Sequence, residues 1–288
     1  MLYQLLQVNH GKKNNLGSLM PKLQLENNFQ LHYEIYGPKI GSAPAIIFAH
    51  GAGGNGLSWW QQVPTFSEKY TVITFDHRAF GRSPDIKNGP GRTAFGTDTR
   101  SLLDHLGLPK VHFVAHSMGG RTAFGVLSQE PERLLSITYS GTNGGCVSDE
   151  YRNRRNELEE NGTLQGSLLQ RAVGQDYAQK NPEMYYLYRK IRSINPPRPR
   201  NFLTPRPSQR NYKGTTADRL RKGGWPILWI VGEQDRIVPP ELIQISHTLT
   251  PESVMQIVPN SGHSAYFEHP DKWNTHVRKF IDSVEENL

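Results

Sequence analysis

The chain has 288 residues, a formal net charge of +7 and 36% hydrophobic residues, which suits one globular domain with an insertion. Its single cysteine, Cys146, excludes an intramolecular disulfide, and no apolar run approaches the roughly 20 residues needed to span a bilayer. No recognised nucleic-acid motif accompanies the positive charge. We therefore expect no nucleic-acid partner, no membrane span and a cytoplasmic protein. Residues 1–20 lack the pattern of a signal peptide, and we expect a disordered extension there.

Strand and helix signals alternate from about residue 21 onward. Alternating apolar residues on both sides of Asn27 and Asn28 predict a hairpin over residues 22–36. Apolar and β-branched runs predict strands at 45–49, 71–75, 111–115, 134–139, 227–231 and 254–258, and a helix is expected at 99–106. The last helix shows one apolar stripe, formed by Trp273, Val277, Phe280, Ile281 and Val284. This alternation predicts an α/β fold with a mostly parallel, doubly wound sheet.

A long segment without strand signals separates the last two predicted strands from the others. Residues 158–187 can form helices, whereas the prolines between 196 and 207 exclude a continuous helix. Residues 143–222 hold 16 Lys and Arg against 8 Asp and Glu, a net +8, which leaves −1 for the rest of the chain. Such a segment is either an electropositive lid that attracts an anionic substrate or a solvated helical surface. We predict an α/β core at 21–142 and 223–288 with a basic cap at 143–222.

The strongest functional signal is the sequence AHSMG, which begins at the last residue of the strand predicted at 111–115 and precedes a helical stretch. A sharp strand–turn–helix bend holds a serine clear of the sheet, and it requires small neighbours on both sides of that serine. Ala115 and Gly119 occupy those two positions around Ser117. The pattern predicts that Ser117 is a nucleophile.

Together with three further loops, this motif resembles the α/β-hydrolase fold superfamily, in its serine-nucleophile form, over about residues 21–286. In that family the chain order is nucleophile, acid, histidine. Here GEQD follows the strand at 227–231 and ends at Asp235, and NSGH follows the strand at 254–258 and ends at His263. Upstream, the sequence HGAGG after the strand at 45–49 is similar to the loop that supplies an oxyanion-hole N–H group.

The resemblance implies a Ser-His-Asp triad that acts through an acyl-enzyme, with no cofactor and no metal. His263 takes the proton of Ser117 and returns it to the leaving group, while Asp235 fixes the tautomer of His263. The backbone N–H groups of Ala52 and Met118 are the expected oxyanion hole. Glu233 competes with Asp235 for the role of the acid, and the resemblance favours Asp235.

Other polar residues near these motifs have structural interpretations. The loop that contains Asp76 and Arg78 braces the fold in the family, and here Ala79 replaces a glycine usual at that position. His116 is expected to pack behind the nucleophile rather than to act as a second base. His32 is expected to be peripheral.

The substrate is less constrained than the chemistry. Trp59, Trp60, Tyr185 and Tyr186 are candidates to line an apolar substrate pocket, although aromatic clusters are often simple packing. Arg121 follows the nucleophile motif, as in menaquinone-pathway lyases of this fold, which hold substrate carboxylates.

The favoured function is hydrolysis of a small-molecule ester or related acyl compound. The basic cap is compatible with an anionic substrate. Three alternatives stay open. They are a carbon–carbon bond hydrolase or menaquinone-pathway-type lyase acting on a carboxylate substrate, a slow-turnover ligand receptor, and a non-catalytic scaffold. The sequence does not fix the oligomeric state.

Overall fold

The computed structural model describes residues 21–198, 202 and 216–288, so the extension predicted at 1–20 lies outside the described residues. Its centre is an eight-stranded sheet with the order β1-β2-β4-β3-β5-β6-β7-β8. The strands are β1 (Lys22–Gln24), β2 (Gln30–Tyr36), β3 (Ala45–Ala49), β4 (Thr71–Phe75), β5 (Val111–His116), β6 (Leu134–Ser140), β7 (Ile227–Gly232) and β8 (Val254–Val258). The first two strands form the predicted antiparallel hairpin, and β2 also runs antiparallel to β4. All further pairings are parallel, which confirms the predicted sheet.

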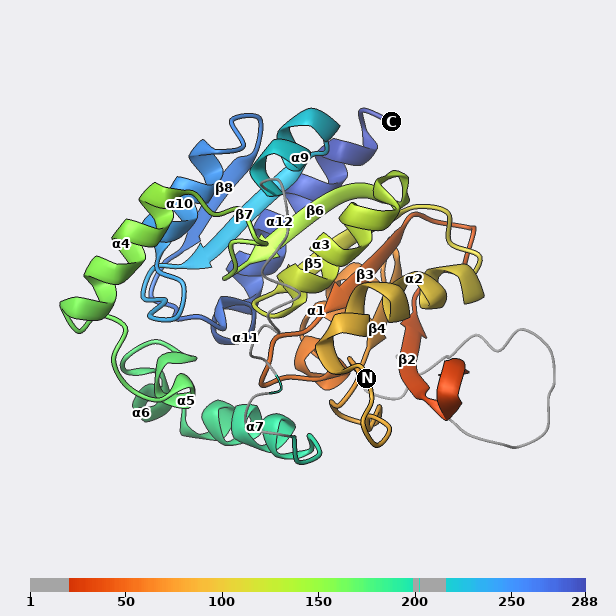
Figure 1. Ribbon diagram of the computed structural model, residues 1–288, viewed down its shortest axis with the longest axis horizontal. Helices are drawn as coiled ribbons and strands as arrows, with labels where there is room; N and C mark the ends of the chain where they lie inside the picture. The colour runs from red at the N-terminus through yellow and green to blue at the C-terminus, as the bar shows by residue number, and fades with distance from the viewer. Residues whose placement is uncertain (1–20, 199–201, 203–215) are drawn as a thin grey trace.

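Helices connect the strands and cover the sheet (Figure 1). The helices are α1 (Gln62–Phe66), α2 (Phe95–His105), α3 (Gly119–Gln129), α4 (Asp149–Glu160), α5 (Leu168–Arg171), α6 (Tyr177–Lys180), α7 (Pro182–Ser193), α9 (Thr216–Gly223), α10 (Pro240–Thr248), α11 (Ala265–Glu268) and α12 (Pro270–Glu285). Short 3-10 turns are η1 (Glu26–Asn28), η2 (Gly56–Trp59), η3 (Gly91–Ala94) and η4 (Pro131–Arg133). Helix α2 begins four residues before the helix predicted at 99–106. Its second residue, Gly96, packs closely on Gly125 of α3, so an apparent helix breaker serves helix packing.

Neighbouring residues of the central strands face two separate apolar layers. Ile47 and Phe113 join a layer with residues of α2, α3, α9 and α10. Ile46 and Val114 join the opposite layer, with residues of α1, α11 and α12. The predicted apolar stripe of α12 lies in this second layer. Because successive strand residues point to opposite faces, these runs of apolar residues require helices on both sides.

The described part of the segment between β6 and β7 carries helices α4 to α7 and then α9. Figure 1 shows α5, α6 and α7 grouped at one end of the molecule, beyond the helices that cover the sheet. Helix α9 differs, because Ala217 and Leu220 pack in the same layer as Ile227 of β7. The predicted boundary at residue 222 therefore divides residues that pack in one layer, since α9 covers the sheet. The division into core and cap remains a prediction.

Candidate active site

Ser117 lies in a strained turn between β5 and α3. Its φ is +51°, in the left-handed region that costs an ordinary residue about 1–2 kcal/mol, and such strain is typical of functional turns. Its backbone N–H donates to the carbonyl oxygen of Ser140 over 2.9 Å. A side chain at position 119 would clash with the backbone carbonyl of Ala49, with the Cβ 2.9 Å from the carbonyl carbon. This close contact explains why a glycine occupies position 119, two residues after Ser117.

Asp235 and His263 meet at the ends of β7 and β8. The Nδ1 of His263 lies 2.8 Å from Oδ2 of Asp235, and both side chains are buried. The other oxygen of Asp235 accepts the backbone N–H groups of Ile237 at 2.7 Å and Val238 at 2.9 Å. Since an ionised carboxylate only accepts, Nδ1 carries the proton and Nε2 is left as the accepting nitrogen. Glu233 instead is exposed and accepts the N–H of Asn260.

His263 lies beside the turn that holds Ser117. Its ring centroid is 4.8 Å from that of His116, and a Cβ at position 141, next to Ser140, would lie 3.1 Å from its Nδ1. Burial lowers the pKa of His116 well below its ordinary value, and its Nδ1 donates to the carbonyl oxygen of Ser140 over 3.0 Å. His116 thus packs as a neutral residue behind the serine.

The loop after β3 passes directly over the serine. A Cβ at position 51 would lie 3.2 Å from the Cβ of Ser117, and Ala52 packs against the cluster that contains Met118. His50 holds this loop in place through both ring nitrogens. Its Nε2 accepts the N–H of His77 at 2.9 Å, so its Nδ1 carries the proton and donates to Gly51 O at 2.8 Å. Burial lowers the pKa of His50 to about 4, so the ring stays neutral. The two residues expected to form the oxyanion hole are thus neighbours of Ser117.

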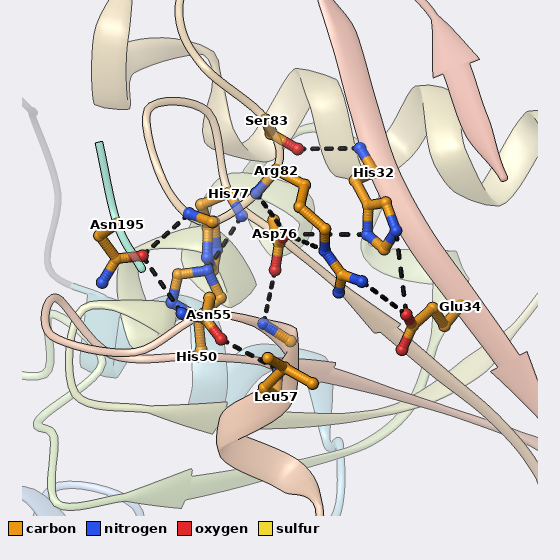
Figure 2. A network of polar contacts seen from close by, with 12 residues as sticks. His32, Glu34, His50, Asn55, Leu57, Asp76, His77, Arg82, Ser83 and Asn195 are labelled. Atoms are coloured by element: carbon orange, nitrogen blue, oxygen red, sulfur yellow. Dashed lines mark hydrogen bonds and ion pairs between the residues drawn. The ribbon is translucent and has the colours of Figure 1, made fainter. Parts of the chain in front are cut away.

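Asp76 holds this loop from its other side (Figure 2). Its carboxylate accepts the N–H groups of Gly56 at 2.6 Å and Arg82 at 2.7 Å. His32 also faces Asp76, with Nδ1 3.7 Å from Oδ2. The expectation that His32 is peripheral is wrong, because β2 lies inside the sheet edge and its ring is buried. The residues around His32 in the sequence do not predict this burial, because it depends on the pairing of β2 with β4.

The neighbouring loop residues also have structural contacts. Arg78 binds Asp98 through Nε at 2.9 Å and Nη2 at 2.7 Å. Ala79 has a φ of +68°, which explains why a glycine suits this position.

The aromatic candidates for the substrate pocket lie in different surroundings. Trp59 is fully buried between Phe48, Tyr266 and Trp273, because η2 turns it into the second apolar layer. It packs the core and has no surface for a substrate, which corrects its proposed role. Trp60 is 41% exposed and Tyr186 is 63% exposed, whereas Tyr185 is half-buried. Arg121 is exposed in the first turns of α3.

Sequence reasoning missed residues that join the segment 172–192 to the histidine loop. Glu268 is buried and accepts the N–H groups of Gly174 at 2.7 Å and Gly262 at 2.9 Å. The hydroxyl of Tyr188 lies 2.9 Å from Oγ of Ser264. The available signal was weak, since Glu268 stands five residues after His263 but has no motif of its own. Across the residues that the structure describes, no group of three His, Cys, Asp or Glu side chains is arranged to hold a metal ion.

The sequence model described as alpha/beta hydrolase fold matches residues 44–270, and the chain belongs to this family. A putative carbamate hydrolase RutD from Caulobacter vibrioides is 33% identical over 127 residues, which are 43% of this chain and 46% of that protein. The chain thus spans about half the length of this relative. The 3-oxoadipate enol-lactonase 1 of Acinetobacter baylyi is 27% identical over 266 residues, 88% of this chain and 94% of that protein.

Solved structures show the same fold at lower identity. A thermophilic esterase from Thermogutta terrifontis aligns with a TM-score of 0.73 and 23% identity, over 93% of this chain and 99% of that chain. An enol-lactonase from Burkholderia xenovorans aligns with a TM-score of 0.67 and 18% identity, over 91% of this chain and all of that one (100%). No helix among the described residues is long and apolar enough to cross a membrane.

Proposed function

We propose that this protein is a cytoplasmic serine hydrolase that cleaves a small-molecule ester or lactone through an acyl-enzyme. The observation that carries the proposal is the contact between His263 Nδ1 and Asp235 Oδ2, next to a serine at φ +51°. Relatives named as a carbamate hydrolase and an enol-lactonase support hydrolytic chemistry.

In the proposed reaction Nε2 of His263 accepts the hydroxyl proton of Ser117 while Oγ attacks the substrate carbonyl. The carbonyl oxygen gains negative charge and is stabilised by the N–H groups of Ala52 and Met118. His263 then protonates the leaving alcohol. The same ring then takes a proton from water, whose oxygen attacks the acyl-enzyme, and His263 returns this proton to Oγ of Ser117 as the acid leaves.

Direct substrate contacts are proposed for Trp60, Arg121, Tyr185 and Tyr186. Ester hydrolysis is favoured over carbon–carbon bond cleavage and lyase chemistry by the esterases and lactonases among the similar proteins. A slow receptor would share the same residues, and only its turnover distinguishes it.

The test is the Ser117→Ala variant, with Ser128→Ala in α3 as a matched control. Wild type and control should release 4-nitrophenol from a series of 4-nitrophenyl esters over many turnovers. Both should also gain one fluorophosphonate adduct by intact-mass spectrometry. Ser117→Ala should do neither, with an unchanged circular dichroism spectrum. Labelling of Ser117→Ala at the wild-type stoichiometry would show that the nucleophile is another residue, and a single slow turnover in the wild type would favour a receptor.

A further inference from the structure

Two arginines from the segment between β6 and β7 lie against the loop after β3, and one of them also contacts the loop after β4. Arg192 belongs to the last turn of α7, and Arg198 follows six residues later. A Cβ at position 53 would collide with the guanidinium of Arg192, and its distance to Nη2 would be 2.7 Å. Arg198 donates from Nη2 to Ala52 O over 3.4 Å and from Nη1 to Ala79 O over 3.2 Å. The absent side chain of Gly53 thus makes room for a cation beside Ala52.

The backbone between the two arginines is anchored to the loops after β3 and β4 (Figure 2). The side chain of Asn195 accepts the N–H of Gly81 at 2.9 Å and donates to Gly53 O at 3.1 Å. Asn55 donates from its side chain to Ile191 O at 2.8 Å. These contacts hold the backbone that carries both arginines in place before any ligand binds, which lowers the entropy cost of binding.

Neither arginine has a carboxylate partner. All acidic side chains lie in the described part of the chain, because residues 1–20, 199–201 and 203–215 contain no Asp or Glu. The ion pairs of that part include none with Arg192 or Arg198. By contrast, Arg78 pairs with Asp98 and Asp85, and Arg82 pairs with Glu34.

The two cations also disfavour one another. Burial, and secondarily the charge of Arg192, lowers the pKa of Arg198. Two partly buried positive charges at one place are unfavourable unless an anion compensates them.

We propose that Arg192 and Arg198 bind a carboxylate that the substrate carries at the end remote from its scissile bond. Arginine suits this task, because its planar group donates two parallel hydrogen bonds to a carboxylate. The assignment rests on the proposed function and narrows its substrate to acyl compounds with a second, ionised acid group. It replaces Arg121, which lies in α3, as the main anion partner.

If the two arginines had only a structural role, the effect of replacing them would be different. Arg198 lies over the ring of Phe80 at 3.9 Å, and Arg192 over that of Tyr188 at 5.5 Å, and in a structural role these contacts would only hold the segment against the core. Loss of these contacts would affect charged and neutral substrates alike.

Two pairs of esters separate these roles. The mono-4-nitrophenyl esters of adipic and glutaric acid are compared with 4-nitrophenyl hexanoate and pentanoate, in which a methyl group replaces the carboxylate. Wild type should show a kcat/KM at least about tenfold higher for the anionic member of one pair, as expected for charge-assisted hydrogen bonds. This preference should fall as salt rises, because screening weakens charge attraction.

Arg192→Gln and Arg198→Gln should each lower kcat/KM for the anionic ester about tenfold or more, mainly through KM. The neutral ester should stay within about twofold. Arg189→Gln removes the same charge from an exposed position of α7 and should change neither. Arg192→Lys should recover part of the preference. A wild type without preference, equal losses for both esters, or an Arg189→Gln variant as impaired as Arg192→Gln would overturn the proposal.

Adipate binding separates this proposal from the proposed function. Isothermal titration calorimetry should show adipate binding to the wild type and to Arg189→Gln, and at least about tenfold weaker binding to Arg192→Gln. Absence of adipate binding to the wild type would refute the anion site even if esters are hydrolysed. Arginine-dependent binding without any ester hydrolysis would support the site and refute the hydrolase. If one glutamine variant fails to fold, the other glutamine variant and Arg192→Lys decide whether binding and preference depend on these arginines.

Discussion

Glu268 should make the stability of this protein fall as pH rises from about 4.5 to 7. Burial, the largest cause, raises the pKa of this carboxyl from 4.5 to about 7, against the hydrogen bonds from Gly174 and Gly262, and Asp235 raises it further. The folded state therefore binds the proton more tightly than the unfolded chain. Stability from this group is complete below pH 4.5 and is lost as pH rises through 7. At about 1.4 kcal/mol per pKa unit, the loss amounts to about 3 kcal/mol.

The assay is urea unfolding of the wild type and of Glu268→Gln between pH 4.5 and 8. The difference in unfolding free energy cancels the groups that titrate alike in both proteins. The wild type should lose about 3 kcal/mol relative to Glu268→Gln across this range, because glutamine does not ionise. Glu160→Gln, at an exposed position of α4, is the control for the substitution itself. A constant difference for Glu268→Gln would refute the assignment of a raised pKa to Glu268.

Two further predictions concern the acid and the serine turn. Asp235→Asn should lower kcat on the order of 10⁴-fold because the tautomer of His263 is lost, whereas Glu233→Gln should stay within about twofold in the same ester assay. The opposite ranking would assign the acid to Glu233. Gly119→Ala should lower the unfolding free energy by about 1–3 kcal/mol, because its Cβ meets the rigid carbonyl of Ala49. Unchanged urea unfolding would show that β3 and α3 separate readily.

The centre of the sheet could be predicted from the sequence because strands β3 to β7 are buried on both faces. Runs such as that at 45–49 are apolar throughout, and β3, β4 and β8 begin and end where the pattern places them. The order of the motifs also located the candidate site. In the sequence, only the resemblance to the family favoured Asp235 over Glu233 as the acid. In the structure, the side chain of Asp235 faces His263, whereas Glu233 is exposed.

Burial of single side chains and contacts between remote segments could not be predicted. Trp59 and Trp60 are adjacent, yet one is fully buried and the other is 41% exposed, because a 3-10 turn has no long apolar periodicity. Arg192 reaches Gly53 across 139 residues, and no local pattern encodes such a contact. Net charge identified a basic segment but not which arginines lie inward, since Arg189 and Arg192 occupy the same helix.

The segment 172–195 binds both loops on which the proposed chemistry depends. On one side, Ala172 O accepts the N–H of Ser264 at 3.0 Å and Tyr188 contacts the same residue, so His263 has a fixed neighbour. On the other side, Asn195 holds Gly53, the residue after Ala52. Loops are ordinarily the most mobile parts of a fold, and a catalytic group displaced by about 1 Å can lose about a hundredfold in rate. The segment 172–195 therefore connects the loop of His263 with the loop of Ala52. We expect changes within it to alter kcat as well as substrate choice.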